Sequence, residues 1–353
     1  MTTILAAQPG FRLAEPGEFT RRAFEHGKLD LTEAEAVADL VAAETSAQRR
    51  QAMRQLEGEL GRLYDTWRGR LVRAGAHVEA AIDFSDEDLP ETLDGAARET
   101  VAALVDEIDR HLADSRRGEI MRDGVSVAIL GPPNVGKSSI LNALSQRDAA
   151  ITSAIAGTTR DVIEVRLDLA GYPVILADTA GLRVGRDAVE EEGVRRARAR
   201  ADDADLTLVV FDMTRSAEIA ELEEIADRAT ILVANKLDLT TASDRAAFRA
   251  RLPKAALPIS ALTGEGMPVL LDRLAGAVKQ RFADRSGPVL TRARHRVALA
   301  ECVAALRRSL SASLPELAAE DLRLAIRALG RITGRVDVED ILDIIFREFC
   351  IGK

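Results

Sequence analysis

A short stretch, GPPNVGKSS at residues 131–139, constrains the fold of this 353-residue chain more than any other feature. It fits the phosphate-loop pattern, in which a glycine, four residues and Gly-Lys-Ser join a strand to a helix. The apolar run at 125–130 has the length of a buried strand, and helical spacing begins at Ser138. The pattern predicts backbone N–H groups around a phosphate at a helix N-terminus, with Lys137 beside the phosphates and the Ser138 hydroxyl available to Mg²⁺.

Four further motifs follow the phosphate loop in order: GTTRD at 157–161, DTAG at 178–181, NKLD at 235–238 and SAL at 260–262. Any one of them is a weak signal, because Gly-rich and polar turns match by chance. In a GTP-binding domain Asp178 would hold Mg²⁺ through water, and the Gly181 N–H would sense the γ-phosphate. All five motifs in this order predict such a domain.

The NKLD motif predicts which base is read. A carboxylate at Asp238 can accept from both N1–H and N2–H₂ of guanine, two donors that adenine does not present together. An unpaired buried carboxylate would cost several kcal/mol, so GTP is favoured over ATP. Leu182 follows DTAG where Ras-like GTPases place a water-orienting glutamine, so the attacking water must be oriented differently. Asn134 in the phosphate loop can ligate a cation beside the phosphates.

The pattern of apolar residues predicts an α/β plus all-α protein. Strand-like runs at 125–130, 161–167, 173–177, 205–211, 229–234 and 256–259 alternate with helical ones, as in a doubly wound P-loop domain over residues 121–283. Helical patterns at 29–120 and 284–353 flank it. We therefore expect a discontinuous helical domain with the GTPase (G) domain inserted, preceded at 1–28 by a remnant of an N-terminal α/β domain.

Within the helical blocks, Thr32 and Glu35 predict a capping box, and a leucine-rich stripe predicts one long helix from about 46 to 82. Further helices are expected around residues 101–112 and over 291–312, 315–329 and 337–350. Residues 1–28 show turn signals and no clear period.

Composition limits where the protein works and what it binds. Its net charge of −9 repels nucleic acid, so an RNA contact needs a local basic patch. The two cysteines, Cys302 and Cys350, are too few for a disulfide framework. No apolar run approaches the roughly 20 residues of a membrane span. We expect a cytoplasmic protein.

The sequence resembles the MnmE (TrmE) family, GTPases of tRNA wobble-uridine modification. The resemblance rests on PGEFTRRAFEHGKLDLTEAEAVADL near the start, on the GTPase motifs including AIAGTTRD, and on the terminal FCIGK at 349–353. It implies K⁺-activated GTP hydrolysis coupled to carboxymethylaminomethyl or aminomethyl modification of tRNA uridine 34 (U34). It also implies an FAD-dependent partner protein and a homodimer through the G domains.

The resemblance implies roles for single residues. Mg²⁺ would be held by Ser138 and Thr159. A K⁺ ion would be held by Asn134, Ser153, Ile155 and Thr158. The family has Thr where this chain has Ser153, but a ligand that uses its backbone oxygen is not affected by that difference. Glu190 would orient the attacking water, although an ordinary acidic helix start is the alternative, because Glu191 and Glu192 adjoin it. The GTP-contacting set would comprise Asn134, Val135, Gly136, Lys137, Ser138, Ser139, Ser153, Ala154, Ile155, Ala156, Gly157, Thr158, Thr159, Asp178, Thr179, Ala180, Gly181, Asn235, Lys236, Asp238, Ser260, Ala261 and Leu262.

A one-carbon donor is the remaining cofactor that the resemblance implies. Lys28 and Lys353 match positions that bind 5-formyl-tetrahydrofolate, and Cys350 matches a family cysteine near that site, although a buried helix residue is an equal alternative. The family begins with a folate-binding, dimer-forming domain, most of which this sequence lacks.

Two questions stay open at the level of sequence. An RNA-binding or ribosome-assembly checkpoint GTPase shares the same G domain, but the flanking helical blocks and FCIGK favour the modification enzyme. A basic cluster is a candidate tRNA-facing surface, with solvated helix faces as the alternative; its members are Arg292, Arg294, His295, Arg296, Arg307 and Arg308.

Overall fold

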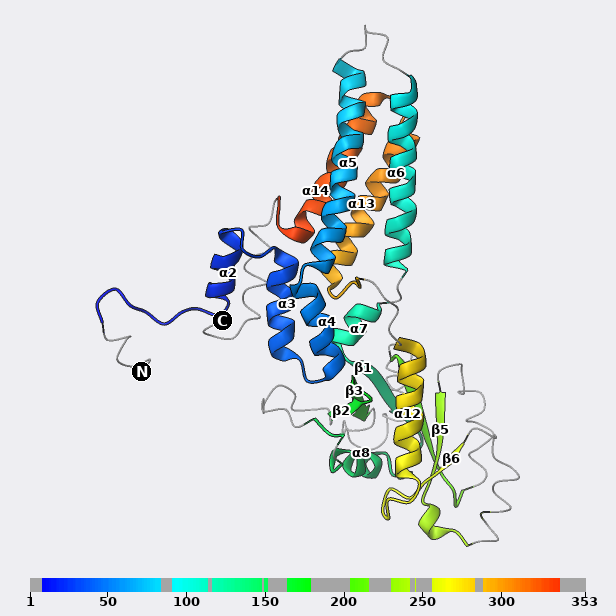
Figure 1. Cartoon of the computed structure of the whole chain (residues 1–353). Coiled ribbons are helices and arrows are strands. Elements are labelled where there is room, and N and C mark those ends of the chain that lie inside the picture. The colour runs from blue at the N-terminus through cyan, green and yellow to red at the C-terminus, as the bar shows by residue number, and fades with distance from the viewer. Residues whose placement is uncertain are drawn as a thin grey trace, which may run out of the picture. The chain divides into compact units, whose positions relative to one another are not determined.

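The computed structural model describes residues 8–83, 91–113, 116–147, 149–151, 164–178, 204–215, 230–241, 245, 256–282 and 288–336. The chain divides into two compact units. The helical unit comprises Met1–Ala43, Gln48–Arg122 and Ser286–Lys353, and the sheet unit comprises Glu44–Ala47 and Asp123–Arg285 (Figure 1). In the part of the chain that is described, no helix is long and apolar enough to cross a membrane.

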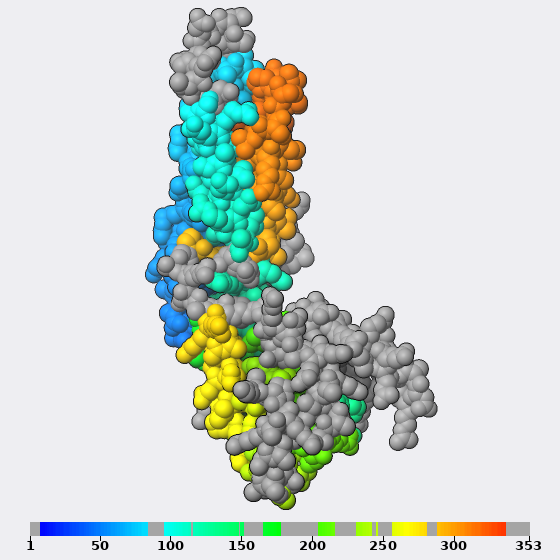
Figure 2. Space-filling model, turned by 90° about the vertical axis from the view of Figure 1, so that its right-hand side faces the viewer, coloured from blue at the N-terminus to red at the C-terminus, as the bar shows by residue number. Residues whose placement is uncertain are grey.

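Four long helices form the body of the helical unit: α5 (Glu59–Asp83), α6 (Glu91–Leu112), α13 (Ala293–Ser311) and α14 (Pro315–Thr333). Helix α5 packs against α6 and α14, and α13 packs against the same two, so the four close into a bundle. Figure 2 shows α6 beside the C-terminal helices. The bundle therefore joins segments from both ends of the sequence.

The bundle core is a continuous apolar cluster drawn from all four helices. Each fully buried leucine or isoleucine stabilises the fold by roughly 1.5–3 kcal/mol relative to an exposed one. Trp67 is buried in this core, and its indole N–H donates to Glu107 at 3.0 Å. Core members with no more than 1% exposure include Leu71, Leu104, Ile108, Leu299, Leu306 and Leu329.

Shorter helices complete this unit: α2 (Glu18–Glu25), α3 (Leu31–Ala42), most of α4 (Ser46–Leu56) and α7 (Arg117–Asp123). Helix α2 lies in the region for which the sequence showed no period. The capping box of α3 is formed by Asp30 and Glu33, so its prediction at Thr32 and Glu35 was wrong. Both of those side chains are buried in the first turns instead.

The single helix predicted over 46–82 is also wrong, because α4 ends at Leu56 and α5 begins at Glu59. Gly58 between them has a φ of 77°, a left-handed conformation in which glycine commonly ends helices. The apolar stripe continues across the break, so its periodicity did not predict that the helix would be interrupted.

The sheet unit contains a six-stranded sheet in the order β2-β3-β1-β4-β5-β6. Its strands are β1 (Val125–Leu130), β2 (Glu164–Leu169), β3 (Tyr172–Asp178), β4 (Leu206–Asp212), β5 (Thr230–Asn235) and β6 (Leu257–Pro258). Helices α8 (Lys137–Ser145) and α12 (Met267–Phe282) and the 3₁₀ helix η2 (Leu237–Leu239) accompany it.

The predicted α/β architecture is confirmed, with every strand within a few residues of its expected place. Strands β3, β1, β4, β5 and β6 are parallel, whereas β2 pairs antiparallel with β3, so the sheet is mixed. Ala170 and Gly171 join β2 to β3, with φ values of 57° and 91°. Two successive positive φ values are typical of the tight turns that close antiparallel hairpins.

Candidate nucleotide site

The phosphate loop connects the carboxyl end of β1 to α8, as its sequence predicted. Gly131 has a φ of 144°, and a β-carbon there would overlap the Val210 carbonyl oxygen. Gly136, at the N-cap of α8, has a φ of 98°, and a β-carbon there would overlap the Asn235 side chain. Only glycine meets both demands, because the backbone conformation and the space each exclude a side chain.

Lys137 is the first residue of α8 and is 7% exposed. Its ammonium donates to the carbonyl oxygens of Gly131 and Pro132, at 2.7 and 2.8 Å. These bonds place a positive charge inside the curve of the loop, next to the helix N-terminus. Both features favour a phosphate at this position. Ser138 and Ser139 follow in the first turn, and both are exposed.

Asn235 joins the phosphate loop to the SAL loop. It is the last residue of β5 and is 2% exposed. Its amide nitrogen donates to the Val135 carbonyl at 2.8 Å, and its amide oxygen accepts from the Ala261 N–H at 3.1 Å. One side chain thus fixes two loops whose contacted residues, Val135 and Ala261, are 126 residues apart in the sequence.

Asp238 lies one turn further on, in η2. The Ser260 hydroxyl donates to one of its carboxylate oxygens at 2.5 Å and itself accepts from the Thr263 N–H at 3.1 Å. Ser260 is fully buried, so it holds the carboxylate from the protein side. Leu262 is 85% exposed beside it. Sequence motifs NKLD and SAL therefore form one structure, in which Asp238 presents a fixed acceptor.

Asp178 is the last residue of β3, where it pairs in register with Ile129 of β1. Because β1 and β3 are parallel, this puts its backbone at the same edge of the sheet as the phosphate loop. The remaining residues predicted to contact GTP, a metal ion, the attacking water or the folate lie outside the described residues: Ser153, Ala154, Ile155, Ala156, Gly157, Thr158, Thr159, Thr179, Ala180, Gly181, Glu190, Cys350 and Lys353. Their predicted roles stay predictions.

Asp212 is a residue of this site that sequence reasoning missed. It ends β4 and is 3% exposed, and one of its carboxylate oxygens accepts from the Lys236 ammonium at 2.7 Å. Burial raises the pKa of this carboxyl, but the hydrogen bonds from Lys236 and Thr214 outweigh burial and hold the pKa below its ordinary value. An acidic residue closing the apolar run LTLVVFD was the available signal.

Lys28 follows α2 and is exposed, with its backbone N–H donating to the Ala23 carbonyl at 2.9 Å. It belongs to the helical unit. Because Lys353 lies outside the described residues, folate binding by these two lysines stays a prediction.

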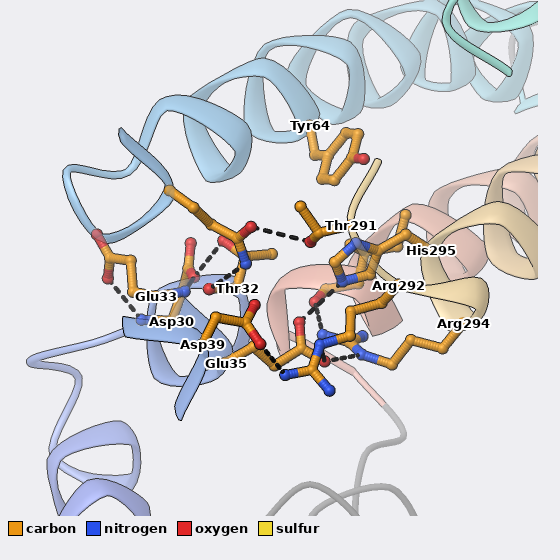
Figure 3. Close-up of polar contacts among 12 residues, drawn as sticks. Asp30, Thr32, Glu33, Glu35, Asp39, Tyr64, Thr291, Arg292, Arg294 and His295 are labelled. Atoms are coloured by element: carbon orange, nitrogen blue, oxygen red, sulfur yellow. Dashed lines mark hydrogen bonds and ion pairs between the residues drawn. The ribbon is translucent and has the colours of Figure 1, made fainter. Parts of the chain in front are cut away.

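The basic cluster predicted to be a tRNA-facing or solvated surface is largely internal, so both alternatives are wrong for its first four members. Figure 3 shows Arg294 and His295 converging on Glu35, and Arg292 on Asp39. Arg294 reaches Glu35 at 2.6 Å, and fully buried His295 lies 3.0 Å from the same carboxylate. Further ion pairs occupy the remaining members, Arg296 with Glu119, Arg307 with Asp109 and Arg308 with Asp321.

Electrostatics in this buried cluster keep the carboxylate charged and the imidazole neutral. Burial raises the pKa of Glu35, but the charge of Arg294 and the hydrogen bond from His295 overcome it and lower the pKa far below its ordinary value. Burial and the neighbouring Arg294 lower the pKa of His295 despite Glu35. Burial also lowers the pKa of His111 to about 4. The cluster is a charged core that ties α3 to α13, not a surface for phosphates.

Known proteins that are similar to this chain belong to the class that its motifs indicate. The MnmE helical domain family matches residues 31–350. A protein from Paramagnetospirillum magneticum described as tRNA modification GTPase MnmE is 59% identical over 345 residues, covering 98% of this chain and 78% of that protein. The same description belongs to a relative from Parvibaculum lavamentivorans, 56% identical over 100% of this chain and 79% of its own.

Among solved structures, the G domain of the T. maritima FeoB iron transporter aligns with 44% of this chain and 98% of its own length, at 29% identity and a TM-score of 0.34. The assignment rests on the sequence relatives, which share more than half of their residues with the chain over nearly its whole length. The chain belongs to the MnmE family of tRNA modification GTPases.

Proposed function

We propose that this protein hydrolyses GTP with K⁺ as an activating ion and couples hydrolysis to carboxymethylaminomethyl or aminomethyl modification of U34 in tRNA, together with an FAD-dependent partner protein. The observation that supports the proposal most is the Asn235 side chain, which bonds to both the phosphate loop and the SAL loop. A bound nucleotide would then have its phosphates at Lys137 and its base edge at Asp238.

Guanine recognition follows from the fixed carboxylate of Asp238. Ser260 occupies one side of it, so an acceptor remains for the N1–H and N2–H₂ donors of guanine. Ala261 adds a backbone that Asn235 holds in place. Adenine offers no matching pair of donors, and its binding would leave the carboxylate unpaired.

The metal ligands proposed for Mg²⁺ are Ser138 and Thr159, with Asp178 acting through water. The described part of this set fits a hard cation, because the Ser138 hydroxyl is exposed directly after Lys137 and Asp178 ends the neighbouring strand. For K⁺ we propose Asn134, Ser153, Ile155 and Thr158. Asn134 is exposed in the loop with a φ of 64°. When bound, K⁺ supplies positive charge where the transferred phosphoryl group becomes more negative.

Glu190 is the proposed general base. In hydrolysis a water oxygen forms a bond to the γ-phosphorus while the bond to the β–γ bridging oxygen breaks, which gives GDP and phosphate. The base orients that water and receives its proton. Residue 182 is leucine, which can do neither. Pairing of two G domains would complete the site, and Lys28 and Lys353 would bind the 5-formyl-tetrahydrofolate carbon donor.

The domain assignment remains part of this proposal, with a helical domain at 29–120 and 284–353 and a G domain at 121–283. The competing function, a ribosome-assembly or RNA-binding checkpoint GTPase, has no observation in its favour within the described residues. It would use the same GTP site without a folate donor or an FAD-dependent partner.

The test is multiple-turnover GTP hydrolysis in KCl and in NaCl at equal ionic strength. We expect strong stimulation by K⁺, lost in Glu190→Ala while GTP binding is retained, with Glu191→Ala as the matched control that keeps both. Equal slow rates in the two salts would contradict K⁺ activation and favour a checkpoint GTPase. An equal loss in Glu190→Ala and Glu191→Ala would contradict the assigned base.

A further inference from the structure

Asp212 and Lys236 are neighbours across two parallel strands. Asp212 ends β4 and pairs in register with Asn235, the last residue of β5, so its carboxylate lies next to the first residues of NKLD. The Lys236 ammonium donates to one carboxylate oxygen at 2.7 Å. The other oxygen accepts from the Thr214 hydroxyl at 2.7 Å and the Thr214 N–H at 2.9 Å. Both oxygens are thus engaged, which fixes the carboxylate's orientation.

Lys236 needs such a restraint, because its backbone is unusual. Its φ is 67°, in the left-handed region that residues with a β-carbon rarely adopt. Such conformations persist where surrounding contacts hold them. The ion pair with Asp212 is a contact of this kind, and Lys236 immediately precedes η2, the turn that carries Asp238.

Burial makes this ion pair stronger than an ordinary surface pair. The Asp212 side chain is 4% exposed and that of Lys236 is 29% exposed. A charged hydrogen bond away from water is less screened and more directional than an exposed one. With its ammonium tied to Asp212, Lys236 is held as the residue that directly precedes η2, the turn containing Asp238.

We infer that Asp212 is a positioning residue for guanine recognition: it holds Lys236 in its left-handed conformation and so fixes the turn that carries Asp238. The inference rests on the proposed guanine site. It adds a specificity-determining residue that touches no ligand and acts only through Lys236.

The experiment is a titration of the full chain with GDP by calorimetry, using a double-mutant cycle of Asp212→Asn and Lys236→Ala. Asp212→Asn keeps the side chain's size and removes its charge. Asp272→Asn, at an exposed position on α12, is the matched control for the same change. Thr214→Val, which removes one of the two donors to the other oxygen, is a milder variant. Thermal melting of each variant reports folding separately.

We expect Asp212→Asn to weaken GDP binding about tenfold, as the loss of a charge-assisted hydrogen bond would. In the Lys236→Ala background the same substitution should change binding less than about twofold, and Asp272→Asn should change nothing. A smaller loss is expected for Thr214→Val. Unchanged binding in Asp212→Asn would overturn the inference, and so would an equal loss in both backgrounds. If the wild-type chain bound no GDP, the proposed guanine site itself would be wrong.

Discussion

Glu35→Gln tests whether the buried ionic cluster holds the helical unit together. Glu35 is 1% exposed and accepts from Arg294 at 2.6 Å, with His295 at 3.0 Å. The amide has the same size but no charge, so Arg294 loses its counter-ion in a largely buried place. Removing one partner of a buried pair costs about 3–5 kcal/mol.

The lower end of that range applies here. Arg294 also donates to the carbonyls of Arg331 and Ile332 at 3.3 and 3.1 Å, and its side chain keeps 22% exposure. We therefore expect the free energy of unfolding to fall by about 3 kcal/mol. With a urea dependence of about 2 kcal/mol per molar, the unfolding midpoint should fall by ~1.5 M.

The chain has one tryptophan, Trp67, which lies in the core of the helical unit. Its fluorescence during urea unfolding therefore reports this unit and not the sheet unit. The matched control is Glu99→Gln on α6, an exposed position where we expect a change below about 0.5 kcal/mol. A midpoint in Glu35→Gln that stays within 0.3 M (roughly 0.6 kcal/mol at that slope) of the wild-type value would refute the reasoning.

Two further predictions concern binding and pH. Asn235→Ala removes both hydrogen bonds that join the phosphate loop to the SAL loop, so calorimetry should show GDP binding roughly 30-fold weaker. Asn142→Ala, at an exposed position of α8, should leave GDP binding unchanged, and equal affinities in the two variants would contradict the linking role. The lowered pKa values of His111 and His295 mean that the unfolded chain binds more protons between about pH 4 and 6.5, so stability by Trp fluorescence should rise with pH across that window. His111→Gln should flatten this rise, and an unchanged slope would contradict the assignment.

The positions of the candidate nucleotide-site residues were predictable from sequence because their motifs are local. Four of the five, the exception being GTTRD, begin at or just after the end of a parallel strand, and parallel strands bring their carboxyl ends to one edge of the sheet. Gly131 and Lys137 therefore lie where the motif placed them. Asn235 and Asp238 do as well, although only the structure gives their bonds to Val135 and Ser260.

The errors arose where distant segments decide the environment. Arg294 and His295 were predicted to be surface residues, because nothing nearby in the sequence indicates that Glu35 packs against them. At Gly58 the apolar stripe continues across a helix break, since periodicity records which face is buried but not whether the backbone is continuous. Asp212 carries no motif, and its role depends on a strand register that the sequence does not state.

The most direct test of the central claim is competition between GDP and its xanthine analogue for the wild-type chain and Asp238→Asn. Xanthine has a carbonyl where guanine has an amino group, so it suits an amide donor in place of a carboxylate acceptor. The account predicts that the wild-type chain prefers GDP and that Asp238→Asn prefers xanthosine diphosphate. An Asp238→Asn variant that still prefers GDP would show that the base is read elsewhere, and the proposed site would be wrong.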